Sequence, residues 1–136
     1  MPPQLIDQSI IHQLRQTVER ISGNSAFLLA KQQDESYVSN RDFLSMFLRA
    51  DHFNVNAAAE RLALHFEVKL ELFGPERLVV DIAQDDLDQE AMDALHCGLT
   101  QPLQERDRSG RSIVVFNANG QQSFGMMGKV IDFVLP

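Results

Sequence analysis

The chain has 136 residues, of which 44% are hydrophobic and 23% are charged, a composition ordinary for one small globular domain. Its formal net charge of −7 argues against a nucleic-acid partner, because contacts to phosphates supply most of the affinity in nucleic-acid binding. It has one cysteine, no signal-peptide pattern and no apolar run of about 18 residues, so we expect a cytoplasmic protein without an internal disulfide or a membrane span.

The first apolar pattern predicts an amphipathic helix over residues 4–22. The polar face of this helix mixes acids with arginines and lacks the cationic bias of membrane-surface helices, so packing on its own domain is favoured. Residues 22–24 end the helix, and residues 25–33 predict a short second one. The polar residues 32–39 are expected to turn the chain. The apolar stripe of the first helix consists of Leu5, Ile6, Ile10, Ile11, Leu14, Val18 and Ile21.

Residues 41–73 predict two helices joined by a tight corner. Ser39 or Asn40 precedes the first helix as its cap, and residues 51–54 interrupt the apolar pattern. Asn54 then caps a second helix whose apolar residues recur three or four apart. Gly74 and Pro75 end the run, since glycine adopts positive φ readily and proline cannot continue a helix. The first helix carries the apolar stripe Phe43, Leu44, Phe47 and Leu48.

Residues 76–97 hold one arginine against seven acidic residues, which predicts a solvated acidic face. Within them the short β-branched run Glu76–Ile82 is compatible with a strand or with irregular structure. Asp85 and Asp86 predict the cap of a helix that holds Leu87, Met92 and Leu95 and closes at Gly98. Cys97 is expected to be a small core residue rather than a nucleophile.

Residues 99–105 and 111–117 predict two strands joined by the loop 106–110, in which Asp107 and Gly110 suit a tight turn. Pro102 lacks an amide proton and limits the pairing of the first strand. The second strand is apolar on both faces and therefore needs cover on both sides. Alternation places Ile113 and Val115 on one face, and Ser112, Val114 and Phe116 on the other.

Two of these segments resemble the CRAL-TRIO family, whose members hold hydrophobic ligands such as phosphatidylinositol, tocopherol or retinaldehyde. Residues 42–59, DFLSMFLRADHFNVNAAA, closely resemble the family signature at the helix corner. Residues 95–116 resemble the segment in which a helix leads through a strand and an Asp-x-x-Gly-Arg turn into the first strand of the lipid-binding sheet. The resemblance spans about residues 25–120.

The resemblance implies a mainly α fold with a short β-hairpin (α+β), namely the N-terminal helical part of the CRAL-TRIO fold with its first strands and an incomplete sheet. Residues 1–75 would form the helical region, and residues 76–136 would begin the lipid-binding domain. Residues 76–82 would be irregular, and residues 124–134 would start the next helix. The family continues beyond this length, so the chain is expected to be a truncated form or a fragment.

The implied function is non-catalytic binding or transfer of a hydrophobic ligand, such as a phospholipid or an isoprenoid, alone or as part of a longer chain. Val114 and Phe116 are the candidate ligand-binding residues; packing in the core is the other interpretation of both. Transient membrane contact and self-association through the exposed hairpin edge are further expectations. The alternative is a helical protein-interaction module that has lost carrier activity.

No pattern in the sequence predicts catalysis or a cofactor. The four histidines, His12, His52, His65 and His96, form no recognisable metal motif, and the glycines at 120, 125 and 128 lack a phosphate-loop context. A helix-turn-helix regulator is the third interpretation of the two-helix corner. The acidic charge argues against it, as does a second helix with only Arg61 and Lys69 as basic residues.

Overall fold

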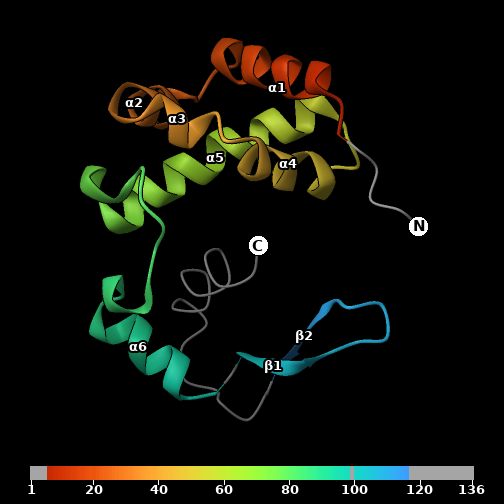
Figure 1. The fold of residues 1–136 in the computed structure, drawn as a ribbon. Helices are drawn as coiled ribbons and strands as arrows, with labels where there is room; N and C mark the ends of the chain where they lie inside the picture. Colours follow the sequence, from red (N-terminus) through yellow and green to blue (C-terminus); the bar gives the residue numbers. More distant parts are fainter. Residues whose placement is uncertain (1–5, 99, 117–136) are drawn as a thin grey trace. The chain divides into compact units, whose positions relative to one another are not determined.

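The computed structural model describes residues 6–98 and 100–116, which are mainly helical and include one two-stranded antiparallel hairpin (Figure 1). This confirms the predicted α+β class. The chain divides after Asp81 into two compact units. Residues 76–81 belong to the first of these units, and Leu78 is fully buried in its core.

The first unit contains five helices among its described residues, and a 3-10 turn follows them. They are α1 (Gln8–Arg20), α2 (Ser25–Gln33), α3 (Glu35–Val38), α4 (Arg41–Ala50), α5 (Val55–Phe73) and η1 (Pro75–Arg77). Helix α1 is shorter than predicted, because the Asp7 side chain accepts from the Ser9 amide at 3.2 Å and starts the helix there. Residues 35–38 form a short helix where only a turn was expected, capped by Asp34.

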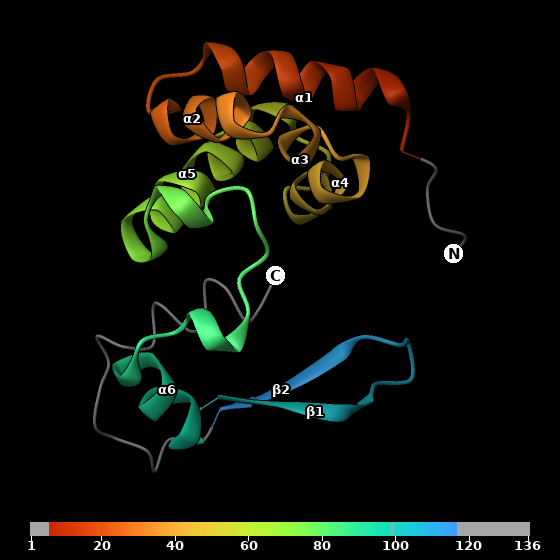
Figure 2. The same cartoon turned by 60° about the vertical axis from the view of Figure 1, so that its left-hand side comes forward.

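Helix α5 is the centre of this unit, and α1, α2 and α4 all pack against it (Figures 1 and 2). Phe66 is fully buried, and its ring meets that of Phe27 in α2 edge-to-face at 5.7 Å between centroids. The buried apolar residues of the unit are Ile6, Ile11, Leu14, Val18, Ala26, Phe27, Ala30, Val38, Leu44, Phe47, Leu48, Ala58, Ala59, Leu62, Ala63, Phe66 and Leu78.

The corner between α4 and α5 is a Schellman motif. The Phe53 amide donates to the Leu48 carbonyl at 2.7 Å, and the His52 amide donates to the Arg49 carbonyl at 3.3 Å. His52 and Phe53 both have positive φ, 52° and 65°, although neither is glycine. The Asn54 side chain then accepts from the Ala57 amide at 3.1 Å, which confirms the predicted cap of α5.

The predicted start of α4 and the predicted end of α5 agree with the structure. The Asn40 side chain accepts from the Phe43 amide at 3.0 Å and caps α4. Helix α5 ends at Phe73, and Gly74 follows with φ 78°. Residues 76–82 form no strand, because a 3-10 turn and irregular backbone follow Gly74, as the irregular interpretation expected.

The second unit begins with the 3-10 turn η2 (Gln84–Asp86) and helix α6 (Gln89–His96). Asp88, not Asp85 or Asp86, caps α6, accepting from the Ala91 amide at 2.8 Å. Asp86 instead accepts from the Ala83 amide at 2.9 Å, so the turn η2 uses this carboxylate. The prediction for Cys97 is also wrong: its thiol is exposed at the end of α6 and donates to the Ala94 carbonyl.

Strands β1 (Thr100–Arg106) and β2 (Ser112–Phe116) form the hairpin. Their register pairs Gln101 with Val115 and Pro102 with Val114, and an irregularity between Pro102 and Arg106 shifts the pairing near the turn. The predicted helix at residues 124–134 and the glycines at 120, 125 and 128 lie outside the described residues.

Candidate functional site

The turn of the hairpin is built around the carboxylate of Asp107. One of its oxygens accepts from the amides of Ser109 and Arg111, each at 2.8 Å, and the other accepts from the Arg111 Nε at 2.6 Å. These hydrogen bonds, those of Arg111 first, lower the pKa of Asp107. Gly110 has φ 79°, a conformation that strains other residues. The predicted turn chemistry is therefore confirmed.

The two predicted ligand-binding residues lie on β2 and share one face of the hairpin. Val114 stands opposite Pro102, and Phe116 stands opposite Thr100. Because the side chains of a strand alternate, Val114 and Phe116 point to the same side. Val114 is half-buried, whereas Phe116 is 57% exposed. Among the described residues this face therefore presents a large apolar ring to solvent.

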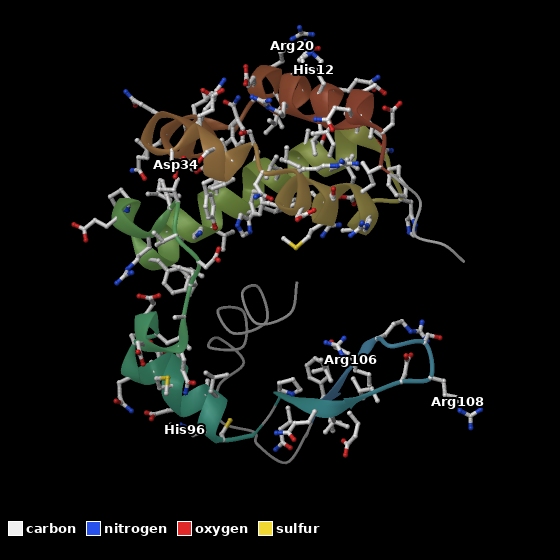
Figure 3. The ribbon with its side chains drawn as sticks, viewed as in Figure 1. His12, Arg20, Asp34, His96, Arg106 and Arg108 are labelled. Atoms are coloured by element: carbon white, nitrogen blue, oxygen red, sulfur yellow. The ribbon has the colours of Figure 1, made fainter. Side chains whose placement is uncertain are left out.

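Apolar residues are exposed elsewhere on the same hairpin. Val115, on the opposite face of β2, is 42% exposed, and Leu103 in β1 is 40% exposed. In the described part of the chain the sheet has only these two strands, so each strand has one edge without a strand partner. Figure 3 shows Arg106 and Arg108 toward the turn, with Arg108 pointing away from the strands. The hairpin thus combines the apolar strand β2 and the mostly polar strand β1 with a charged turn.

A second cluster, which the sequence did not predict, surrounds Lys69 in α5. Lys69 is only 2% exposed, and its ammonium donates to the Val80 carbonyl at 2.6 Å and to the Tyr37 hydroxyl at 3.1 Å. That hydroxyl in turn donates to the Asp81 carboxylate at 3.1 Å. The ammonium also lies 5.0 Å from the centroid of the Tyr37 ring. A signal was present in the sequence, since Lys69 continues the buried stripe of Leu62 and Phe66.

Burial dominates the electrostatics of this cluster. It lowers the pKa of Lys69 to about 8, while the negative charge of Asp81 acts in the opposite direction. Burial also raises the pKa of Tyr37 to about 12, and the charge and hydrogen bond of Asp81 add to this effect. At neutral pH the lysine is therefore cationic and the tyrosine neutral. Lys69 is too buried to attack a substrate in this conformation.

His65 lies beside this cluster, among aromatic rings. Its centroid is 5.4 Å from that of Phe47 and 5.2 Å from that of Phe66. Burial, and then the charge of Lys69, lower the pKa of His65 to about 4, so the ring is neutral at pH 7. Over residues 6–98 and 100–116, no group of three histidine, cysteine or acidic residues is placed to hold a metal ion.

The basic residues named for α5 are both engaged within the protein. The Arg61 guanidinium donates to both carboxylate oxygens of Asp51, at 2.8 and 2.9 Å, and this pairing lowers the pKa of Asp51. Lys69 is buried, as described above. Because both side chains are held by contacts within the protein, neither is placed to contact bases in a DNA groove, as the recognition helix of a helix-turn-helix protein does.

Comparisons with models of protein families, with curated proteins and with solved structures gave no match. None of the helices in the described part of the chain is long and apolar enough to cross a membrane.

Proposed function

We propose that this chain is a non-catalytic lipid-binding or lipid-transfer protein of the CRAL-TRIO type. Its ligand is a hydrophobic molecule such as a phospholipid or an isoprenoid, bound by this chain alone or as part of a longer one. The observation that carries the proposal is the apolar face of β2, where Val114 and Phe116 point the same way and Phe116 is 57% exposed. An exposed apolar surface of this kind favours contact with an apolar partner.

The helices support the same proposal through their sequence. The residues that resemble the family signature form α4, the corner and the start of α5, and the Asp-x-x-Gly-Arg residues 107–111 form the hairpin turn. These two elements carry the resemblance. The non-catalytic part of the proposal is favoured by the burial of Lys69, the described lysine whose pKa is clearly lowered.

A helical protein-interaction module is the alternative. It is favoured by Met46 in α4 and Leu64 in α5, which are 46% and 61% exposed, whereas Leu44 and Leu62 of the same helices are fully buried in the core. Exposed apolar side chains on a closed helical unit are typical of a surface that binds another protein.

The proposal places the protein in the cytoplasm and gives it transient contacts with membranes, where a lipid ligand would be collected or delivered. Self-association would use the edges of the hairpin that have no strand partner among the described residues. Nucleic acid is not proposed as a partner, because the net charge is −7 and Arg61 is paired with Asp51.

The test is to purify the chain, extract it with organic solvent and identify any co-purified lipid by mass spectrometry. In parallel, fluorescent phospholipid, tocopherol and retinoid are titrated into the protein. Saturable binding of one ligand class at a ratio of about one per chain is expected. Absence of bound lipid and of saturable binding, together with stable co-purification of a protein, would instead support the interaction module.

A further inference from the structure

The last residues of the first unit, Leu78–Asp81, form what we term the exit segment, because the second unit begins at residue 82. Leu78 is fully buried in the core, but burial then declines along the segment. Val79 is half-buried, Val80 is 38% exposed and Asp81 is exposed. Apolar packing therefore anchors the segment at Leu78 and holds it only weakly beyond that residue.

Beyond Leu78 the segment is attached by polar contacts to two helices. The Val80 carbonyl accepts from Lys69 in α5 at 2.6 Å, and the Asp81 carboxylate accepts from the Tyr37 hydroxyl of α3 at 3.1 Å. The contact between Lys69 and Tyr37 at 3.1 Å links these two attachments. We term these four residues the Lys69 network. It joins parts of the chain that lie far apart in sequence.

We propose that the Lys69 network is a releasable joint: residues 79–81 detach from the helical unit in a local opening that leaves the core folded. The joint does not depend on which ligand or partner the protein has. When the joint opens, the last residue that packs on the helical unit is Leu78 instead of Asp81.

The physical basis is a balance between hydrogen bonds and the hydration of a charge. In the closed state the Lys69 ammonium is buried at a cost in solvation, which its hydrogen bonds offset. When the segment leaves, these bonds are lost, but the long lysine side chain can carry its ammonium into water. The regained hydration compensates for much of the loss, so the open state lies close in free energy to the closed one.

The amino acids of the segment also favour another conformation when it is free. Leu-Val-Val-Asp-Ile is rich in β-branched residues and prefers an extended backbone, whereas the joint holds it in irregular structure. Three released residues, at about 3.3 Å each when extended, lengthen the link to the second unit by about 10 Å. The joint thus sets how many residues link the two units.

The experiment is hydrogen–deuterium exchange measured by mass spectrometry on the full chain. Lys69→Met removes the ammonium but keeps an apolar stem of similar length, and Tyr37→Phe removes only the hydroxyl. Tyr37→Phe is expected to exchange about five- to tenfold faster than wild type in peptides covering residues 78–83, because it loses the hydrogen bonds to Lys69 and Asp81 and leaves the lysine charge in place. Lys69→Met removes the charge together with its hydrogen bonds and is expected to raise the exchange rate less. Peptides from α4 and α5 should exchange at the wild-type rate in Tyr37→Phe.

Lys31→Met is the matched control, since Lys31 makes an ion pair with Glu19 at 2.6 Å on the outside of the same unit. It should leave residues 78–83 unchanged. The proposal is overturned if Tyr37→Phe speeds exchange in α4 and α5 as much as in residues 78–83, since the opening would then be global. It is equally overturned if residues 78–83 exchange at the wild-type rate in both joint variants. Should Lys69→Met fail to fold, Tyr37→Phe decides alone.

Discussion

One carboxylate oxygen of Glu67, in α5, accepts a hydrogen bond from the Ala26 amide at the start of α2 at 3.0 Å. The same oxygen accepts from the Ser25 hydroxyl at 2.8 Å. Helix α2 has no cap from its own preceding residue, because the Asn24 side chain donates to the Val18 carbonyl instead. The central helix therefore supplies the cap of a helix 41 residues earlier in the chain.

Replacing this long-range cap should destabilise the helical unit. We expect Glu67→Ala to lower the free energy of unfolding by about 1 kcal/mol, the usual cost of removing a helix cap. Glu67→Gln keeps an oxygen acceptor and should lose less. Chemical denaturation followed by circular dichroism measures both variants. Equal stability of Glu67→Ala and wild type would show that the hydrogen bonds to Glu67 contribute nothing to folding.

The corner between α4 and α5 offers a stabilising substitution. His52 is exposed and occupies the left-handed position of the Schellman motif with φ 52°, which glycine adopts without strain. His52→Gly should raise the free energy of unfolding by about 1 kcal/mol, because side chains other than glycine are strained there. His52→Ala is the control and should not stabilise. Thermal melting of the two variants distinguishes them, and a lower melting temperature for His52→Gly would refute the assignment of strain to this residue.

His65 should make the helical unit sensitive to acid. Its pKa is about 4 in the folded protein, below the ordinary value of 6.5, so the unfolded chain binds a proton first as the pH falls. The contribution of His65 to stability is therefore complete above pH 6.5 and is lost as the pH falls from 6.5 toward 4. This loss amounts to about 3 kcal/mol at most.

The variant that tests this prediction is His65→Leu, which replaces the imidazole by an apolar group among Phe43, Phe47 and Phe66. Urea denaturation at pH 7 and pH 4.5 gives the change in unfolding free energy for each protein. The variant should lose distinctly less stability between the two pH values than wild type. An identical loss in both proteins would mean that His65 titrates normally in the folded state.

Local signals in the sequence were enough to predict helices α2, α4 and α5 and the hairpin. Asn40, Asn54 and Gly74 mark helix ends by their own side chains or backbone, so no distant partner is needed to recognise them. The turn at residues 107–110 is recognisable for the same reason. The shared face of Val114 and Phe116 follows from the alternation of a strand.

The sequence did not reveal two kinds of feature. One is a contact between residues far apart in the chain, and the other is a choice among neighbouring residues of the same type. The buried stripe of α5 marks the position of Lys69, but its hydrogen-bond acceptors, Tyr37 and Val80, are 32 and 11 residues away, and no local pattern reports such partners. The cap of α6 was misplaced because Asp85, Asp86 and Asp88 are equally good caps by residue type. Binding of a ligand by Val114 and Phe116 stays a prediction.

The central claim, that the hairpin binds an apolar ligand, is tested most directly by comparing two matched surface variants. Phe116→Ser removes the ring that is 57% exposed on β2, and Leu28→Ser removes a side chain that is 44% exposed on α2. Binding of the fluorescent lipid that wild type binds best is measured by equilibrium titration for both. We expect Phe116→Ser to weaken binding about tenfold, as the loss of a well-buried apolar contact would, and Leu28→Ser to bind as wild type does. Equal affinity of the two variants for lipid would contradict the account.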